Sequence, residues 1–393
     1  MQIKGFKFST VEAAIKKPGR KDLALILSKV PAVCAATFTS NKVKAAPVLL
    51  GQERVADGIL RAVVVNSGNA NACTGEPGMA AARETARLVA EAAGVSEADV
   101  VPSSTGVIGV QMPMDRLSAA IPALVSGLAD GTLDDVARAI MTTDTFPKIS
   151  SRQGVAGGNA YTIAGVAKGA GMIRPDMATM LSFIVTDAAV EPTFLKNAFK
   201  SAVASSFNCI TVDNDMSTND TALIMANGMS GNAPIDAASP DAGQFAALLS
   251  EVALDLAKAI VKDGEGATKF VTINVSGAAS GDDARLAAMA VANSPLVKTA
   301  FFGQDANWGR ILAAVGYSGA AVEQSQVSLF FDDVQMVAGG LFVGGDAEKK
   351  GSEVLKKPEF AVNIDLALGN GRSTVYTSDF SYDYVKINAD YRT

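Results

Sequence analysis

Apolar residues recur at helical spacing in several long stretches of the chain. One of them, "PGMAAARETARLVAEAAG" at residues 77–94, opens with a proline, closes with a glycine and places apolar residues three and four positions apart. Proline in the first turn and glycine beyond the last turn are typical helix boundaries. The same pattern predicts amphipathic helices over residues 114–131, 192–207, 243–264 and 282–293.

Shorter stretches have the composition of β-strands. Runs rich in β-branched and aromatic residues predict strands over residues 61–66, 161–169, 181–188, 269–277 and 326–331. Near the C-terminus the polarity alternates, as it does in half-buried antiparallel strands, over residues 359–371, 372–378 and 383–391. The pattern as a whole predicts a mixed α/β fold with much antiparallel pairing.

The length of 393 residues suggests two or three domains, at about 100 to 200 residues each. A stretch rich in Gly, Ser and Ala, "SGAASGDD" at residues 276–283, is the best candidate for a boundary, and it ends in acids suited to a helix start. We therefore expect a core over residues 1–275 and a smaller C-terminal α/β domain over residues 276–393.

The charge of the chain argues against nucleic-acid and membrane partners. The formal net charge is −6, the sequence pI is near 5.0, and basic residues form only short pairs such as Lys16-Lys17. Such a chain lacks an extended basic surface, whereas small polar substrates remain open. The N-terminus lacks the apolar segment of a signal peptide, and no stretch approaches the roughly 20 apolar residues of a membrane span. We expect a soluble, cytoplasmic protein.

The sequence contains no histidine, and this restricts its chemistry. Ser-His-Asp and Cys-His triads and His-ligated zinc sites are excluded. The cysteines, Cys34, Cys73 and Cys209, lie far apart without the spacing of metal ligands, so we expect them to be reduced and mostly buried. Near pH 7 only a shifted carboxylate, lysine or thiol, or a free α-amino group, can exchange protons.

The stretch "KGAGMIRPDMATML" presents a hydroxyl in an unusual setting. Gly169 and Gly171 allow backbone conformations closed to other residues, and Pro175 fixes φ. Ala178 adds no bulk beside the Ala178–Thr179 peptide bond, whose carbonyl the Thr179 hydroxyl could attack. Because β-branched residues also suit buried strands, the sequence alone allows a purely structural role for Thr179.

Cleavage of that bond would supply the base that the chain lacks. An N-to-O acyl shift followed by hydrolysis would make Thr179 a new N-terminus. Its α-amine, with an ordinary pKa of about 7.7 to 8.0, can act as general base to its own hydroxyl. Acyl transfer also needs donors for an oxyanion, and "VPSSTGVIG" at residues 101–109 offers hydroxyls and the unobstructed amide of Gly106, although such a loop is usually a plain turn.

Four further stretches carry polar groups whose role the sequence leaves open. "VVVNSGNANACTG" follows a predicted strand but lacks the spacing of a nucleotide-binding loop. "VDNDMSTNDT" is either a site for a hard cation or a hydrogen-bonded loop. "VKDGEGATK" presents Glu265, which either pairs with a substrate ammonium or lies in a helix C-cap. "FFGQDANWGRI" is typical of a loop that packs Trp308 before a helix.

Taken together, these stretches resemble the ornithine acetyltransferases, also called glutamate N-acetyltransferases. The resemblance covers essentially the whole chain and rests on "VVVNSGNANACTG", "PSSTGVIG", "MTTDTFPK", "KGAGMIRPDMATML", "DNDMSTNDT", "DGEGATK" and "GQDANWGR". It implies a ping-pong transfer of an acetyl group from N-acetylornithine to glutamate in arginine biosynthesis. The expected fold is then a layered αββα-type catalytic core with the smaller C-terminal domain.

The resemblance also implies self-processing. The precursor would cleave between Ala178 and Thr179 into an α chain of residues 1–178 and a β chain of residues 179–393, with Thr179 as the catalytic nucleophile. The family suggests an assembly of two α and two β chains. It implies no metal and no cofactor, and acetyl-CoA is a candidate co-substrate that would make the enzyme bifunctional.

The remaining roles carry over residue by residue. Thr105 and Gly106 of "SSTGVIG" would form the oxyanion hole. Lys168 could hold the carboxylate of N-acetylornithine and Glu265 its side-chain ammonium. The implied substrate contacts are Thr142, Lys168, Thr179, Glu265, Asn388 and Thr393.

Two other interpretations stay open at this point. A self-processing amidase or aminopeptidase would share the nucleophile but pass the acyl group to water. A metabolite-binding protein would hold a ligand in its glycine-rich loops, remain uncut and form no acetyl-enzyme.

Overall fold

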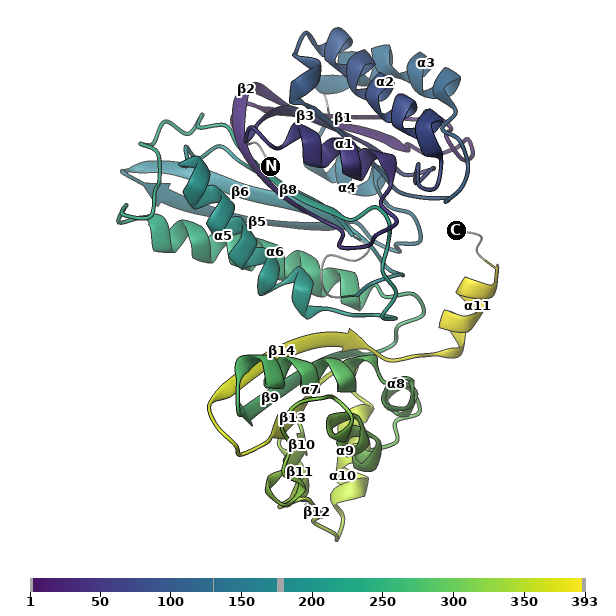
Figure 1. Ribbon diagram of the computed structural model, residues 1–393, viewed down its shortest axis with the longest axis vertical. Helices are drawn as coiled ribbons and strands as arrows, with labels where there is room; N and C mark the ends of the chain where they lie inside the picture. Colours follow the sequence, from purple (N-terminus) through teal and green to yellow (C-terminus); the bar gives the residue numbers. More distant parts are fainter. Residues whose placement is uncertain (1–2, 130, 175–179, 391–393) are drawn as a thin grey trace. The chain divides into compact units, whose positions relative to one another are not determined.

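The structure is a computed structural model that describes residues 3–129, 131–174 and 180–390 (Figure 1). The chain divides into two compact units. Among the described residues, the first unit contains the chain up to residue 208 and residues 215–260, and the second contains residues 209–214 and 261–390.

The first unit is built on a mixed sheet flanked by helices. Its strands follow the order β4-β3-β2-β8-β7-β6-β5, and β1 pairs with β2. The pairs β3–β4 and β7–β8 are parallel and the others antiparallel. The strands are β1 (Phe6–Val11), β2 (Leu23–Phe38), β3 (Ile59–Asn66), β4 (Val100–Ser104), β5 (Lys148–Ala156), β6 (Asn159–Lys168), β7 (Leu181–Thr186) and β8 (Thr221–Ala226). The helices are α1 (Ala46–Arg54), α2 (Gly75–Ala93), α3 (Met114–Ser126), α4 (Leu133–Ala139), α5 (Pro192–Ala204) and α6 (Ala242–Lys262).

Strand β2 joins two layers of this sheet. Its pairing with β3 shifts register between Leu27 and Ala32, and beyond that shift it pairs with β8. Apolar side chains from both halves of the sheet, such as Ile26 of β2 and Phe183 of β7, belong to one buried cluster. Val64, on the opposite face of the β1–β4 half, packs with side chains of α2 and α3.

Helix α6 lies along the other half of the sheet. The Phe245 ring of α6 packs against the Tyr161 ring of β6, with centroids 5.9 Å apart, and α5 packs against α6 through Phe194. Figure 1 shows α2 and α3 on one side of the strands and α5 and α6 on the other. The predicted αββα layering is confirmed.

The second unit is a smaller α/β domain. Its six-stranded sheet has the order β12-β11-β10-β13-β9-β14, in which β9 and β13 run parallel. The strands are β9 (Phe270–Ala278), β10 (Ser328–Phe331), β11 (Val334–Ala338), β12 (Leu341–Phe342), β13 (Glu359–Asp365) and β14 (Gly371–Ser378). The helices are α7 (Gly281–Asn293), α8 (Pro295–Phe302), α9 (Trp308–Gly316), α10 (Ala347–Leu355) and α11 (Tyr382–Asp390).

The predicted helices are confirmed as α2, α3, α5, α6 and α7, but two predictions at the C-terminal side need correction. Residues 383–391 were expected to form a strand, whereas Tyr382–Asp390 form α11. This helix buries none of its side chains, so no core face imposes a helical pattern on its sequence. Among the described residues, no helix has the length and apolar character needed to cross a bilayer.

The predicted boundary after residue 275 falls inside β9, and the two units separate near residue 260 instead. The Gly- and Ser-rich stretch is the tight connection from β9 to α7. Gly277 has a positive φ of 65°, and the Ser280 hydroxyl accepts a hydrogen bond from the amide of Asp283. The Gly and Ser residues that suggested a linker are therefore turn and helix-cap residues.

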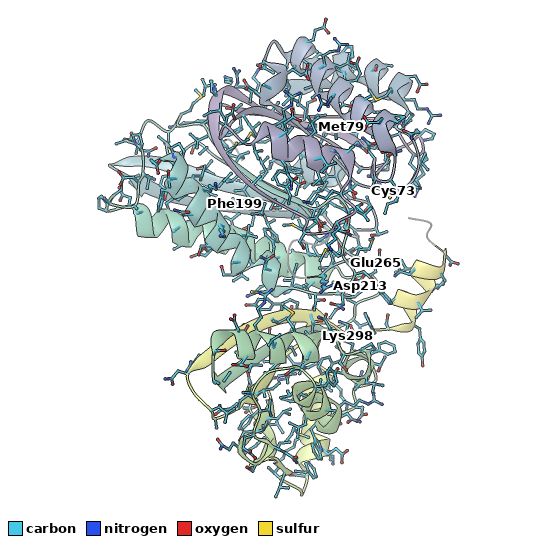
Figure 2. All side chains as sticks on the ribbon, in the orientation of Figure 1. Cys73, Met79, Phe199, Asp213, Glu265 and Lys298 are labelled. Carbon is cyan, nitrogen blue, oxygen red and sulfur yellow. The ribbon has the colours of Figure 1, made fainter. Side chains whose placement is uncertain are left out.

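A buried lysine lies in the second unit. Lys298 of α8 is 1% exposed, and its Nζ donates to Thr377 Oγ1 at 2.8 Å and to the Ser378 carbonyl (Figure 2). The Nζ atom also lies 4.6 Å from the centroid of the Phe380 ring. Burial lowers the pKa of Lys298 to about 7, against the opposing influence of Asp379 and Asp213.

The stability of the chain should therefore rise with pH above neutrality. The folded pKa of Lys298 is about 7, below the ordinary 10.5, so between these values the unfolded chain binds more protons. Urea unfolding of the second unit between pH 7 and 10 should show a free energy of unfolding that rises with pH, and less steeply in Lys298→Met. Lys349→Met, at an exposed position, is the matched control. Equal slopes in wild type and Lys298→Met would contradict this assignment.

Candidate active site

The residues implicated by sequence fall into two groups. Thr105, Gly106, Thr142 and Lys168 belong to the first unit, and Glu265 and Asn388 belong to the second. Ala178, Thr179 and Thr393 lie outside the described residues.

In the first unit, Lys168 brings two predicted threonines together. It is the last residue of β6 and is 4% exposed. Its Nζ donates to Thr142 Oγ1 at 2.7 Å and to Thr105 Oγ1 at 3.5 Å. Thr105 follows β4 directly, and Lys168 pairs with Leu181 of β7. Side chains from distant parts of the sequence thus meet at the ends of β4 and β6.

The carboxylate of Asp144, which the sequence did not single out, lies beside Lys168 and Thr142. Asp144 Oδ1 lies 2.7 Å from Lys148 Nζ, and its Oδ2 lies 3.9 Å from Lys168 Nζ. The amides of Thr142 and Gly169 donate to the same carboxylate at 2.9 and 2.7 Å. Burial by itself raises the pKa of Asp144, but the ammonium groups of Lys168 and Lys148 outweigh it and hold the pKa at about 2. Asp144 is therefore ionised at neutral pH.

Gly106 lies where no other residue fits. Its φ is +134°, and a Cβ atom would lie 2.5 Å from the carbonyl carbon of Gly68 and 2.7 Å from the amide nitrogen of Asn69. The backbone bonds on either side hold the two loops in this close approach, since Thr105 N donates to Asn66 O at 2.9 Å and Ala70 N donates to Val107 O at 3.0 Å. The loop is thus more than a plain turn, because its backbone is packed against a second loop.

Asn219 and Asp220 connect this loop to the chain that follows the predicted cleavage point. The side-chain amide of Asn219 donates through Nδ2 to the carbonyls of Ala70 and Ser104 at 2.6 and 2.8 Å. Asp220 Oδ1 accepts a hydrogen bond from the amide of Met180 at 2.7 Å. These contacts favour a hydrogen-bonded loop over a cation site for this stretch.

In the second unit, the two predicted substrate contacts meet directly. Asn388 of α11 donates through Nδ2 to Glu265 Oε2 at 2.9 Å. Gly266 has a φ of +67°, and a Cβ there would lie 2.4 Å from the amide nitrogen of Tyr384, so the loop packs closely against the start of α11. Figure 2 labels Glu265 on this unit. The alternative of a simple helix cap does not explain this pairing with a residue 123 positions away.

The comparison with known proteins decides the family. The ArgJ family model matches residues 7–393. A protein of Geobacter sulfurreducens named arginine biosynthesis bifunctional protein ArgJ is 68% identical over 393 residues, which are 100% of both chains. The chain belongs to the ArgJ family. The protein of the same name from Syntrophotalea carbinolica is 57% identical over 394 residues, again covering 100% of both chains.

A crystal structure of ArgJ from Bacillus halodurans supports the fold of this ArgJ chain. It is 40% identical, covers 54% of this chain and 100% of its own, and aligns with a TM-score of 0.53. The resemblance to the acetyltransferases of arginine biosynthesis is confirmed, and the amidase alternative is not favoured. ArgJ membership makes the chain an enzyme, which the binding-protein alternative did not require.

The expectation that the cysteines of this ArgJ chain are mostly buried fails at Cys73. Cys34 is buried and Cys209 half-buried, but Cys73 is exposed in a turn with a positive φ of 57°. Asn side chains help to hold the turn that carries Cys73, and Asn71, for example, donates to the Gly78 carbonyl at 2.9 Å. Burial raises the pKa of the Cys34 thiol to about 12, so that thiol is not a nucleophile at neutral pH.

Sequence reasoning missed Asp144, Lys148, Asn219 and Asp220 as parts of the site. The signal was present, because these residues lie within "MTTDTFPK" and "DNDMSTNDT", two of the stretches that carry the family resemblance. Their partners lie far away in sequence, however, and only the sheet topology shows which backbone groups they reach.

The close approach at Gly106 predicts a difference between two neighbouring glycines. Gly106→Ala must displace the Gly68 backbone, whereas Gly109→Ala, at a φ of +80° with no atom within 4 Å of its Cβ, adds only backbone strain. Gly106→Ala should therefore lower the free energy of unfolding by about 1–3 kcal/mol more than Gly109→Ala. Urea titrations of both variants measure this difference. Equal losses would show that the two loops can separate without cost.

Proposed function

We propose that this ArgJ chain transfers the acetyl group of N-acetylornithine to glutamate through an acetyl ester on Thr179. The observation that carries the proposal is the cluster of Thr105, Gly106 and Lys168 at the strand ends, in a chain that lacks histidine. Membership of the ArgJ family, whose members are named for arginine biosynthesis, supports the acetyl-transfer chemistry.

The nucleophile of the proposed reaction is made by the chain itself. Self-cleavage between Ala178 and Thr179 frees the α-amine of Thr179, which then takes the proton of its own hydroxyl. Thr179 Oγ attacks the acetyl carbonyl carbon, the C–N bond of N-acetylornithine breaks, and the proton passes to the leaving amine. Glutamate enters next, and its α-amine attacks the ester to form N-acetylglutamate and restore the hydroxyl.

The oxyanion of each tetrahedral intermediate needs fixed hydrogen-bond donors. We assign this role to the Thr105 hydroxyl and the Gly106 amide. Gly106 has no Cβ, the Thr105 amide donates to the Asn66 carbonyl, and the Asn219 side chain donates to the Ser104 carbonyl. These features support the assignment, because donors held in advance need no rearrangement during the reaction.

Substrate recognition follows from charge. We propose that Lys168 and Thr142 bind the carboxylate of N-acetylornithine and that Glu265, held by Asn388, binds its side-chain ammonium. Thr393 and Thr179 complete the proposed contacts. The curated relatives are called bifunctional, and acetyl-CoA is the second donor that we propose. An α2β2 assembly of the cleaved chains and a cytoplasmic location are part of the same proposal, which includes no metal.

Self-processing predicts a specific mass. The denatured wild type should give two species that sum to the 40.3 kDa chain plus one water, with the second beginning at Thr179. Thr179→Ala should remain a single species and form no N-acetylglutamate, because it removes the proposed nucleophile. Thr179→Ser keeps a hydroxyl and serves as the control that still cleaves. A wild type that stays uncut during incubation would refute the mechanism.

The assignment of Glu265 predicts an effect on one substrate only. Glu265→Gln should raise KM for N-acetylornithine by roughly 10- to 100-fold, because it removes a charge-assisted bond. KM for glutamate, which has no side-chain ammonium, should change far less. Steady-state kinetics with each substrate varied separately test this, with Glu348→Gln on the exposed surface of α10 as control. An equal rise in both KM values would contradict the ammonium contact.

A further inference from the structure

The first unit contains an ion cluster that has almost no access to water. The side chains of Asp144 and Lys148 are 0% exposed and that of Lys168 is 6% exposed. Buried charges persist only when they are paired and hydrogen-bonded, so the partners of these groups indicate what the cluster does.

The two lysines lie at different distances from the carboxylate of Asp144. Lys148 forms a direct ion pair at 2.7 Å, whereas Lys168 stays 3.9 Å away from the other oxygen. Lys148 is thus hydrogen-bonded to the carboxylate, whereas Lys168 interacts with it through charge across the longer distance. The ammonium of Lys168 also donates hydrogen bonds to hydroxyl oxygens, at 2.7 Å for Thr142 and 3.5 Å for Thr105.

A hydroxyl that accepts from an ammonium is a better donor. It has one O–H and two lone pairs, so the bond from Lys168 leaves the Thr105 hydrogen available for another oxygen. Bonds in such a chain polarise each other, most strongly where water is excluded. Lys168 therefore prepares the Thr105 hydroxyl for the oxyanion role assigned to it above.

Asp144 binds the backbone on which Lys168 and Thr142 lie. It accepts hydrogen bonds from the backbone amides of Thr142 and Gly169. Thr142 is a hydroxyl partner of Lys168, and Gly169 is the next residue in the chain. Its carboxylate also lies beside the ammonium itself. Asp144 has no exposed side-chain surface, so it acts through Lys168 and not by touching a substrate.

We propose that Asp144 is a positioning residue of the acetyl transfer, which sets the Thr105 hydroxyl as an oxyanion donor through the ammonium of Lys168. The inference rests on the proposed function. It adds a relay from a buried carboxylate to the reacting oxygen, so that part of the transition-state stabilisation comes from a group that never meets the substrate.

A double-mutant cycle between Asp144→Asn and Thr105→Val tests the relay. Asp144→Asn should lower kcat for N-acetylglutamate formation by roughly 10- to 100-fold, somewhat less than the loss of a whole oxyanion donor. In the Thr105→Val background, where no hydroxyl remains to be positioned, the same change should lower kcat by less than about 3-fold. Equal losses in both backgrounds would overturn the proposal, since a merely structural role is independent of the hydroxyl.

A charge-matched variant protects the test against misfolding. Asp144→Asn removes one negative charge beside two buried ammonium groups, whereas Asp144→Asn with Lys148→Met removes one charge of each sign and leaves the net charge of the wild type unchanged. If neither folds, as judged by thermal unfolding, a cycle of Lys168→Met with Thr105→Val tests the relay at the ammonium. Because Lys168 is also proposed to bind the substrate carboxylate, kcat is then measured at saturating N-acetylornithine. Non-additive losses of kcat support the relay in each version, and additive losses overturn it.

Two controls separate this inference from the proposed function. Asp134→Asn removes an exposed carboxylate that pairs with Arg138 and should leave kcat unchanged. All variants are assayed after their cleavage state has been measured by intact mass, so that processing and transfer are scored separately. A wild type that forms no N-acetylglutamate would refute the proposed function, whereas an active wild type with an additive cycle would refute the relay alone.

Discussion

Strand β2 forms backbone hydrogen bonds in both layers of the first unit, and the candidate site depends on this shared strand. Its first part pairs with β3, whose end carries Asn66, and its second part pairs with β8, which follows Asp220. A strand that continues through both layers fixes their registers relative to each other. The ends of β4 and β6 are thereby held close enough for Thr105 and Lys168 to touch.

The polar side chains at this point are held by backbone groups more than by each other. Asn66, Asn219 and Asp144 all bond to amides or carbonyls of neighbouring loops. Because buried amides and carbonyls must find partners, each of these side chains fixes the path of a loop that carries a reacting group. Donors fixed in this way are already oriented when an oxyanion forms, and acyl transfer requires this of its oxyanion hole.

The absence of histidine gives the cluster of charges its importance. In a His-based enzyme the imidazole both moves the proton and is oriented by a carboxylate. In this ArgJ chain the proposed base is an α-amine, and the carboxylate of Asp144 lies instead beside the lysine that contacts Thr105. The orienting acid would thus serve the oxyanion donor and not the base.

The long amphipathic helices, most of the apolar strands, the exclusion of histidine chemistry and the family could all be predicted from the sequence, because they follow from residue spacing and from motifs along the chain. The prediction was wrong for α11, whose side chains face no core, and for the boundary at residues 276–283, where turn residues imitated a linker. The position of Asp144 between Lys148 and Lys168, and the contact of Asn388 with Glu265, became visible only in the folded chain. The partner of a buried charge depends on which strand ends and loops the fold brings together. The local sequence carries no information about the spatial distance between such segments.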